Sequence, residues 1–192
     1  KQGLDERRTT SFAALPDGKL LAGTVSGLYA STDGGKSWVR KSDPALSVLS
    51  IAVQPSRPQR VVLGTEGSGA WISDDGGESF KAIASPYKGS WFTGEMNDAR
   101  LLLAGLRGNV WRSADGGANW QQVASPIPAS ITASATASDG SVLLASQAGV
   151  VMRLRADALV PVNSNPLPMP AGLLPARDGG VLTVGVAGAQ AL

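Results

Sequence analysis

The sequence contains neither cysteine nor histidine, and these two absences exclude several kinds of chemistry. Without them the chain lacks the usual protein ligands of zinc, copper and haem, the histidine general base and the cysteine nucleophile. We therefore expect no metal site and no cofactor. Any catalysis would have to rest on carboxylates, Tyr, Ser, Lys or Arg.

Long apolar runs and a strong net charge are also missing. No stretch of eighteen consecutive apolar residues occurs, so we expect no transmembrane span. The chain has 17 Lys and Arg against 15 Asp and Glu, and it lacks the cluster of aromatic and basic residues that single-stranded nucleic acid needs. Nucleic acid is therefore not an expected partner. The chain starts without Met and without a signal peptide, as expected of a processed or trimmed protein.

An eight-residue pattern occurs three times and predicts a recurring turn. The copies are STDGGKSW (31–38), SDDGGESF (73–80) and SADGGANW (113–120). In each, the Asp can accept hydrogen bonds from the N–H groups ahead of it, and glycine takes the positive φ that a tight reversal needs. The closing aromatic anchors the outgoing strand by packing. We interpret these positions as structural: Ser31, Asp33, Gly35, Trp38, Ser73, Asp75, Gly77, Phe80, Ser113, Asp115, Gly117 and Trp120.

A second regularity sets the architecture. Five apolar runs end in a small residue, with spacings of 41, 41, 41 and 39 residues between those ends, at Gly23, Gly64, Gly105, Ser146 and Gly185. A period near 40 with short Val- and Leu-rich segments, and without helical periodicity, is typical of β-propeller blades. The sequence predicts an all-β propeller of four-stranded antiparallel blades in a single domain, 1–192, with about five blades if the chain is whole.

The repeats are not equivalent along the chain. They span approximately 12–43, 48–85, 91–125, 131–165 and 173–192. In the second repeat we expect an inner strand at 48–54, a second strand at 60–65, a third strand that ends at Ile72, and an outer strand at 80–84. The fourth has Arg155-Ala-Asp157-Ala in place of the recurring turn, and the fifth stops where an outer strand should begin. Residues 1–10, through Asp5 to Thr10, are expected to close the ring by completing the last blade. The alternative is that further blades precede this chain.

The pattern Ser-x-Asp-x-Gly-x-x-Trp resembles the Asp-box, or bacterial neuraminidase repeat, of β-propellers. Together with the LLAG-type strands it resembles the photosystem II stability and assembly factor-like family. This resemblance implies an exported, periplasmic and non-enzymatic scaffold that binds a protein and helps to assemble or stabilise a membrane-protein complex. The same box occurs in sialidases and xyloglucan hydrolases, so a glycoside hydrolase or a carbohydrate-binding propeller remains the alternative. A two-carboxylate mechanism would first be sought at Glu66 and Glu95.

Function in a repeat protein is expected where the repeats differ. The links opposite the recurring turns hold the candidate binding residues Glu66, Tyr87, Lys88, Trp91 and Arg107. Exposed Tyr and Trp beside a basic residue are typical of interface anchors. The alternative for Trp91 is a core position at the start of an inner strand. No catalytic residue is assigned.

Overall fold

The computed structural model describes residues 4, 8–98, 100–176 and 179–192. These residues form five antiparallel sheets and one short 3-10 helix, η1 (Leu106–Gly108). The first blade contains β1 (Thr9–Ala14), β2 (Leu20–Thr24), β3 (Gly27–Ser31) and β4 (Val39–Arg40), and the second contains β5 (Val48–Val53), β6 (Val61–Thr65), β7 (Ala70–Ser73) and β8 (Lys81–Ile83). The third contains β9 (Trp91–Asn97), β10 (Arg100–Gly105), β11 (Val110–Ser113) and β12 (Gln121–Val123). The fourth contains β13 (Ile131–Thr136), β14 (Val142–Ser146), β15 (Val151–Arg155) and β16 (Ala158–Pro161), and the fifth contains β17 (Pro170–Pro175), β18 (Val181–Gly185) and β19 (Gly188–Ala191).

The fold is the predicted all-β propeller, with each blade following the one before it in the sequence. In the second blade the observed strands match the expected segments to within about one residue at most ends. Leu63 pairs with Ile51 on one side and with Trp71 on the other, and Trp71 pairs in turn with Ala82. This order, from inner to outer strand, confirms the blade read from the sequence.

The second strand of each inner blade is buried on both faces because a neighbouring blade covers each face. Every residue of β6 is buried, which explains its continuous apolar composition. The small residue that ends such a run has a steric cause. A Cβ on Gly64 would lie 2.8 Å from both the Cβ and the carbonyl oxygen of Trp91 in the next blade. The backbone of the neighbouring inner strand therefore passes too close for any larger side chain.

Hydroxyl groups connect successive inner strands. Thr10 donates to the carbonyl of Val48, at the junction of the first and second blades. Ser50 donates to the carbonyl of Trp91 at 3.3 Å, and Thr132 donates to the carbonyl of Pro170 at 2.6 Å. These bonds account for the Ser and Thr content of otherwise apolar inner strands, since each satisfies a carbonyl that faces the adjacent blade.

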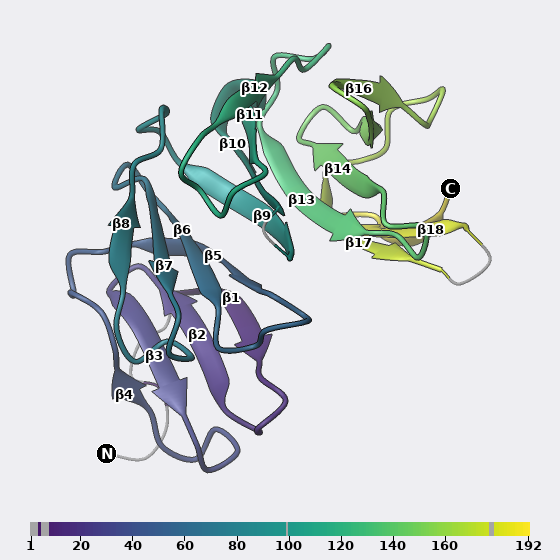
Figure 1. Cartoon of the computed structure of the whole chain (residues 1–192). Helices are drawn as coiled ribbons and strands as arrows, with labels where there is room; N and C mark the ends of the chain where they lie inside the picture. Colours follow the sequence, from purple (N-terminus) through teal and green to yellow (C-terminus); the bar gives the residue numbers. More distant parts are fainter. Residues whose placement is uncertain (1–3, 5–7, 99, 177–178) are drawn as a thin grey trace.

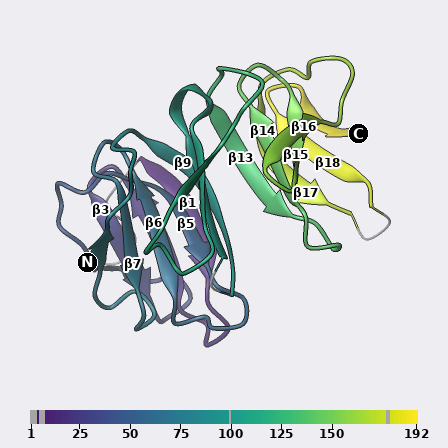
Figure 2. The ribbon, with the colours of Figure 1, turned by 45° about the horizontal axis from the view of Figure 1, so that its top comes forward.

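The five blades form an open arc. The inner strands pack in chain order, β1 on β5, β5 on β9, β9 on β13 and β13 on β17, and the described residues show no comparable packing of β17 on β1. Both ribbon views place the first and fifth blades at opposite ends of a curved row (Figures 1 and 2). Val184 in β18 is 48% exposed, whereas the residues of β6 are covered, because among the described residues no further blade packs against this face of the fifth.

The fifth blade has three strands among the described residues, as expected from where its repeat stops. The predicted closing strand falls mostly outside the described residues, which omit 1–3 and 5–7. Of that segment, Thr9 and Thr10 belong to β1, which is the inner strand of the first blade and pairs with β2.

Candidate functional site

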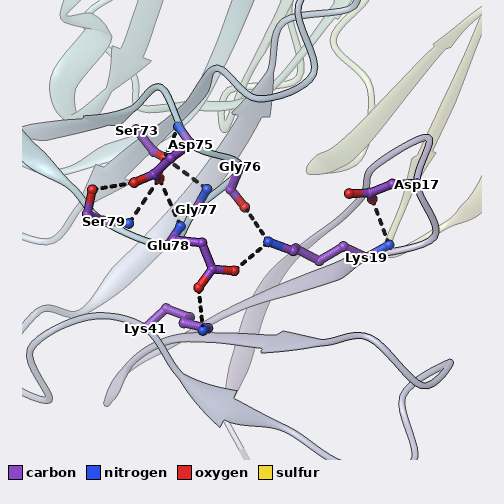
Figure 3. A network of polar contacts seen from close by, with 9 residues as sticks. All are labelled: Asp17, Lys19, Lys41, Ser73, Asp75, Gly76, Gly77, Glu78 and Ser79. Atoms are coloured by element: carbon purple, nitrogen blue, oxygen red, sulfur yellow. Dashed lines mark hydrogen bonds and ion pairs between the residues drawn. The ribbon is translucent and has the colours of Figure 1, made fainter.

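The turns between third and fourth strands lie on one face of the arc, and we name the three with the recurring pattern the Ser-Asp turns (31–38, 73–80 and 113–120). In the turn of the second blade, the buried Ser73 hydroxyl donates to Asp75 at 2.6 Å and accepts from the Gly77 N–H at 2.9 Å (Figure 3). Asp75 also accepts from the N–H groups of Glu78 and Ser79, each at 3.0 Å. Gly77 has φ +86°, so the turn needs a residue without a Cβ there.

The other two Ser-Asp turns repeat this geometry. Gly35 donates to the Ser31 hydroxyl at 2.9 Å, and Gly117 donates to the Ser113 hydroxyl at 2.8 Å. The closing tryptophan indole then donates to the carbonyl of this glycine, at 3.0 Å for both Trp38 and Trp120. The Ser and Asp contacts therefore close all three hairpins, and the two turns that end in Trp add the indole bond.

These contacts fix the protonation state of the aspartates. The hydrogen bonds from the Ser37 hydroxyl and N–H hold the pKa of Asp33 well below its usual range. The Ser73 hydroxyl, followed by Ser79, does the same for the pKa of Asp75. The Asn119 N–H is the main cause that lowers the pKa of Asp115 to about 2. Each carboxylate is ionised at neutral pH and engaged within its own turn, which suits a structural role.

The opposite face is built from the links that join second to third strands and each outer strand to the next inner strand. We name it the link face. Three equivalent backbone bonds hold it: the N–H groups of Glu66, Leu106 and Gln147 donate to the carbonyls of Ser47, Ser90 and Ser130, at 3.0, 3.1 and 2.7 Å. Each link leading into a blade is thus tied to the link within that blade. Residues on this face therefore lie on links that are joined by backbone hydrogen bonds, and we name these joined links the rim.

Three of the predicted binding residues lie in two adjoining links of the link face at the third blade. Lys88 lies in the link that leads into this blade and Arg107 lies in η1, and both are exposed. Tyr87 is half-buried, and its ring packs edge-on against Trp91 with 5.0 Å between centroids. The Ser90–Leu106 bond brings the two segments together. Arg107 has φ +57°, a left-handed conformation uncommon for a residue with a Cβ.

Trp91 is fully buried, so it is the core residue of the alternative sequence interpretation and not an exposed anchor. It begins β9 and packs with Val62, Ile72 and Leu103 between the second and third blades. Glu66 is exposed, but it lies in the corresponding link of the second blade and accepts from the Ser47 hydroxyl at 3.1 Å. Tyr87, Lys88 and Arg107 therefore lie in two adjoining links of the third blade, with Glu66 in the corresponding link of the second.

A pocket of about 680 Å³ between the third and fourth blades was missed by sequence reasoning. Its lining includes Glu95, Arg100, Arg112, Asp115 and Trp120, together with residues of the β13–β14 link. The one sequence signal that bears on it is the missing turn of the fourth repeat. In the structure β15 and β16 are joined by a turn of only two residues, Ala156 and Asp157. The turn that covers this place in earlier blades is absent here.

The carboxylates of this pocket are already engaged. Glu95 accepts from the hydroxyls of Ser134 and Thr136, both at 2.7 Å, which ties β9 to β13. Asp115 belongs to a Ser-Asp turn, as described above. Of the residues that the structure describes, no group of three or more Asp and Glu is arranged to hold a metal ion. Within the same residues, no helix has the length and apolar character needed to cross a membrane.

Comparisons with known proteins show the fold. No protein-family model matches the chain, and no curated protein sequence matches it. Among solved structures, YCF48 bound to D1 peptide is 17% identical with a TM-score of 0.71, over 95% of this chain and 65% of that one. YCF48 from Cyanidioschyzon merolae is 13% identical with a TM-score of 0.71, over 95% and 66%. The GH74 xyloglucanase from Xanthomonas campestris is 16% identical with a TM-score of 0.76, over 94% and 36%.

This chain therefore spans about two thirds of the length of the YCF48 structures and about a third of the xyloglucanase. Identities this low establish a shared propeller fold. The same fold carries a peptide-bound protein in one case and a glycoside hydrolase in another, so the fold alone does not select an activity.

Proposed function

We propose that this chain is a non-enzymatic scaffold that binds a polypeptide through the link face at the third blade. The observation that carries the proposal is the grouping of Tyr87, Lys88 and Arg107 on a hydrogen-bonded rim, with both cations exposed. Neither cation has an ion-pair or hydrogen-bond partner for its side chain among the described residues. Tyr and Arg carry a disproportionate share of interface energy.

The chemistry of the rim indicates the kind of partner. Two cations without partners favour a segment with acidic side chains, because an opposing charge steers association and suppresses wrong partners. The ring of Tyr87 is fixed against Trp91, so little side-chain entropy is lost when a partner covers it. Similarity to YCF48 bound to D1 peptide supports a polypeptide as the ligand class.

The family resemblance of the sequence extends the proposal. The Ser-Asp turns have the residue pattern of Asp-boxes, and their hydrogen bonds support a structural role for them. With the assembly factor-like family as the guide, the partner is a component of a membrane-protein complex and the protein is exported to the periplasm. Fractionation of the host cells would test the location, and recovery in the cytoplasm would contradict it.

A glycoside hydrolase is the alternative, since GH74 enzymes share the fold. The pocket between the third and fourth blades contains two carboxylates, Glu95 and Asp115. A general acid needs a raised pKa. Asp115 has its pKa lowered to about 2 by Asn119 and Ser113, and Glu95 has both oxygens occupied by hydroxyl donors. These engagements favour the scaffold over the hydrolase.

Affinity capture from the native host tests the proposal. Lys88→Ala and Arg107→Gln should each weaken retention of a true partner, and losing one anchor costs at least about 2 kcal/mol, or roughly a thirtyfold rise in Kd. Matched controls are Lys36→Ala and Arg155→Gln, which remove exposed cations on the Ser-Asp face. All four variants should keep the wild-type thermal midpoint because the changed side chains are exposed.

Retention that is unchanged in both link-face variants would overturn the proposed surface. Equal loss in the link-face and control variants would show a charge effect without a site. Turnover of a sialoside or a β-glucan by the wild type would favour the hydrolase, and Glu66 and Glu95 would then be the first carboxylates to replace.

A further inference from the structure

One basic residue recurs where the second strand of a blade begins. Lys19 precedes β2, Arg60 precedes β6 and Arg100 begins β10, with spacings of 41 and 40 residues. The three positions are equivalent in the repeat. Their surroundings differ, and the difference follows from the turn that the next blade provides.

The first two members of this series lie against the Ser-Asp turn of the following blade. Lys19 donates to the carbonyl of Gly76 at 3.2 Å and pairs with Glu78 at 2.6 Å, as Figure 3 shows. Arg60 lies under the turn of the third blade, where a Cβ on Gly116 would come within 3.4 Å of its guanidinium. It also pairs with Asp74 at 3.0 Å. Each of these cations is both covered and neutralised.

Arg100 has no such cover, because the fourth blade has a two-residue turn in place of a Ser-Asp turn. The pocket of about 680 Å³ lies where a Ser-Asp turn of the fourth blade would otherwise be. Arg100 belongs to its lining and is exposed. Its side chain has no hydrogen bond or ion pair within the described residues. The single acidic residue of the short turn, Asp157, pairs with Arg112 instead.

The other charged groups of the pocket are satisfied. Arg112 donates to the carbonyl of Ala156 at 2.7 Å and to Gln121 at 2.8 Å, besides its ion pair. The oxygens of Glu95 and Asp115 accept the bonds given above. Arg100 is thus the one charged side chain in the lining with no partner among the described residues. The apolar part of the lining consists of Leu101, Leu102, Trp120, Val142 and Leu154.

We propose that this pocket is a binding site for a monocarboxylate attached to an apolar group, with Arg100 pairing with the carboxylate. A guanidinium binds a carboxylate through two parallel hydrogen bonds. The fixed charges of Glu95 and Asp115 in the same lining repel an anion in proportion to its charge, so they disfavour a dianion such as a phosphate monoester more than a monocarboxylate. The volume lies within the usual range for small-ligand pockets, about 300–1,000 Å³. The site is on the Ser-Asp face and does not depend on the link-face proposal.

Titration of the ¹⁵N-labelled chain by NMR tests the site without any variant. Benzoate should shift the Trp120 indole N–H resonance saturably, whereas neutral benzamide and dianionic phenyl phosphate should bind at least about tenfold more weakly. Two sources share this chemistry, a small acid and a peptide C-terminus. Gly-Gly-Leu with a free or an amidated C-terminus distinguishes them. Binding of the free peptide at least about tenfold tighter than benzoate assigns a C-terminus, and otherwise a small acid is assigned.

Arg100→Gln should weaken the binding of benzoate by about tenfold or more, while Arg100→Lys should retain part of it. Arg155→Gln removes a nearby exposed cation that is not in the lining and should bind as the wild type. Equal binding of acid and amide, an unchanged affinity in Arg100→Gln, or no saturable shift at Trp120 would each overturn the proposal. The amide spectrum of each variant shows directly that it is folded.

Discussion

Replacing Asp75 by alanine tests whether the Ser-Asp turns stabilise their blades. The change removes the acceptor for the N–H groups of Glu78 and Ser79, which are exposed and can bond to water instead. It also leaves the Ser73 hydroxyl without its acceptor, and Ser73 is only 2% exposed. One buried donor without a partner costs about 1–3 kcal/mol, so we expect a loss near 2 kcal/mol in the free energy of unfolding.

Urea unfolding followed by circular dichroism measures this loss. In a chain of this size, 1 kcal/mol moves the thermal midpoint by about 2–4 °C, so the variant should melt about 4–8 °C lower. Asp17→Ala is the matched control, because Asp17 accepts one hydrogen bond, from the exposed N–H of Lys19 at 2.9 Å (Figure 3). It should stay within about 0.5 kcal/mol of the wild type. Equal stability of the two variants would refute the structural role of the turn, as would loss of a bound partner by fully folded Asp75→Ala.

The pH dependence has a defined sign. Hydrogen bonds, above all that from the Ser73 hydroxyl, hold the pKa of Asp75 below its unfolded value of 3.8 in the folded protein. Its contribution to stability is therefore complete above about pH 5 and is lost as the pH falls through the folded-state value. The stability difference between wild type and Asp75→Ala should be constant from about pH 7 to 5 and narrow below about pH 4. A difference that widens in acid would contradict this assignment.

Two further changes probe the junctions between blades. Gly64→Ala places a Cβ 2.8 Å from the Trp91 backbone, so it should lower the free energy of unfolding by about 1–3 kcal/mol. In the control Gly172→Ala the nearest atom is 3.8 Å away, so its stability should stay within about 0.5 kcal/mol of the wild type. Equal free energies of the two variants in urea unfolding would argue against close packing at Gly64. Lys19→Met removes the ion pair with Glu78 and also the hydrogen bond to the Gly76 carbonyl. The side chain of Glu78 is 48% exposed, so the ion pair should contribute under about 1 kcal/mol of the destabilisation, and that part should shrink at 1 M salt. A cost that does not change with salt would show that the lost hydrogen bond and packing dominate.

The repeat period and the Ser-Asp pattern were sufficient to predict the blades, because each depends on local residues and fixed spacing. The role of Trp91 was not decidable in this way. It follows a polar link, and alternation alone does not tell whether an aromatic residue at a strand start faces a neighbour or solvent. The deciding fact lies in the previous blade, because the Trp91 side chain packs with Val62 and Ile72 there.

The pocket could not be predicted from the sequence, for a related reason. The missing turn at 155–158 is visible in the sequence, and Lys19, Arg60 and Arg100 are visible as equivalents. What the sequence does not display is that the basic residue of one blade meets the turn of the next. That pairing runs between repeats and depends on how blades stack, so the loss of a turn in the fourth repeat changes the surroundings of a residue in the third.

A Ser-Asp turn in this propeller has two separate physical tasks. It closes its own hairpin, and in the second and third blades it also covers the cation of the blade before it, as the contacts of Lys19 with Gly76 and of Arg60 with Gly116 show. The first task is not needed where a two-residue turn joins the strands, as it does between β15 and β16. Loss of the second task uncovers a charge and opens a space at the same step. Divergence of a single repeat can therefore create a candidate binding pocket from side chains that were already present in its neighbour.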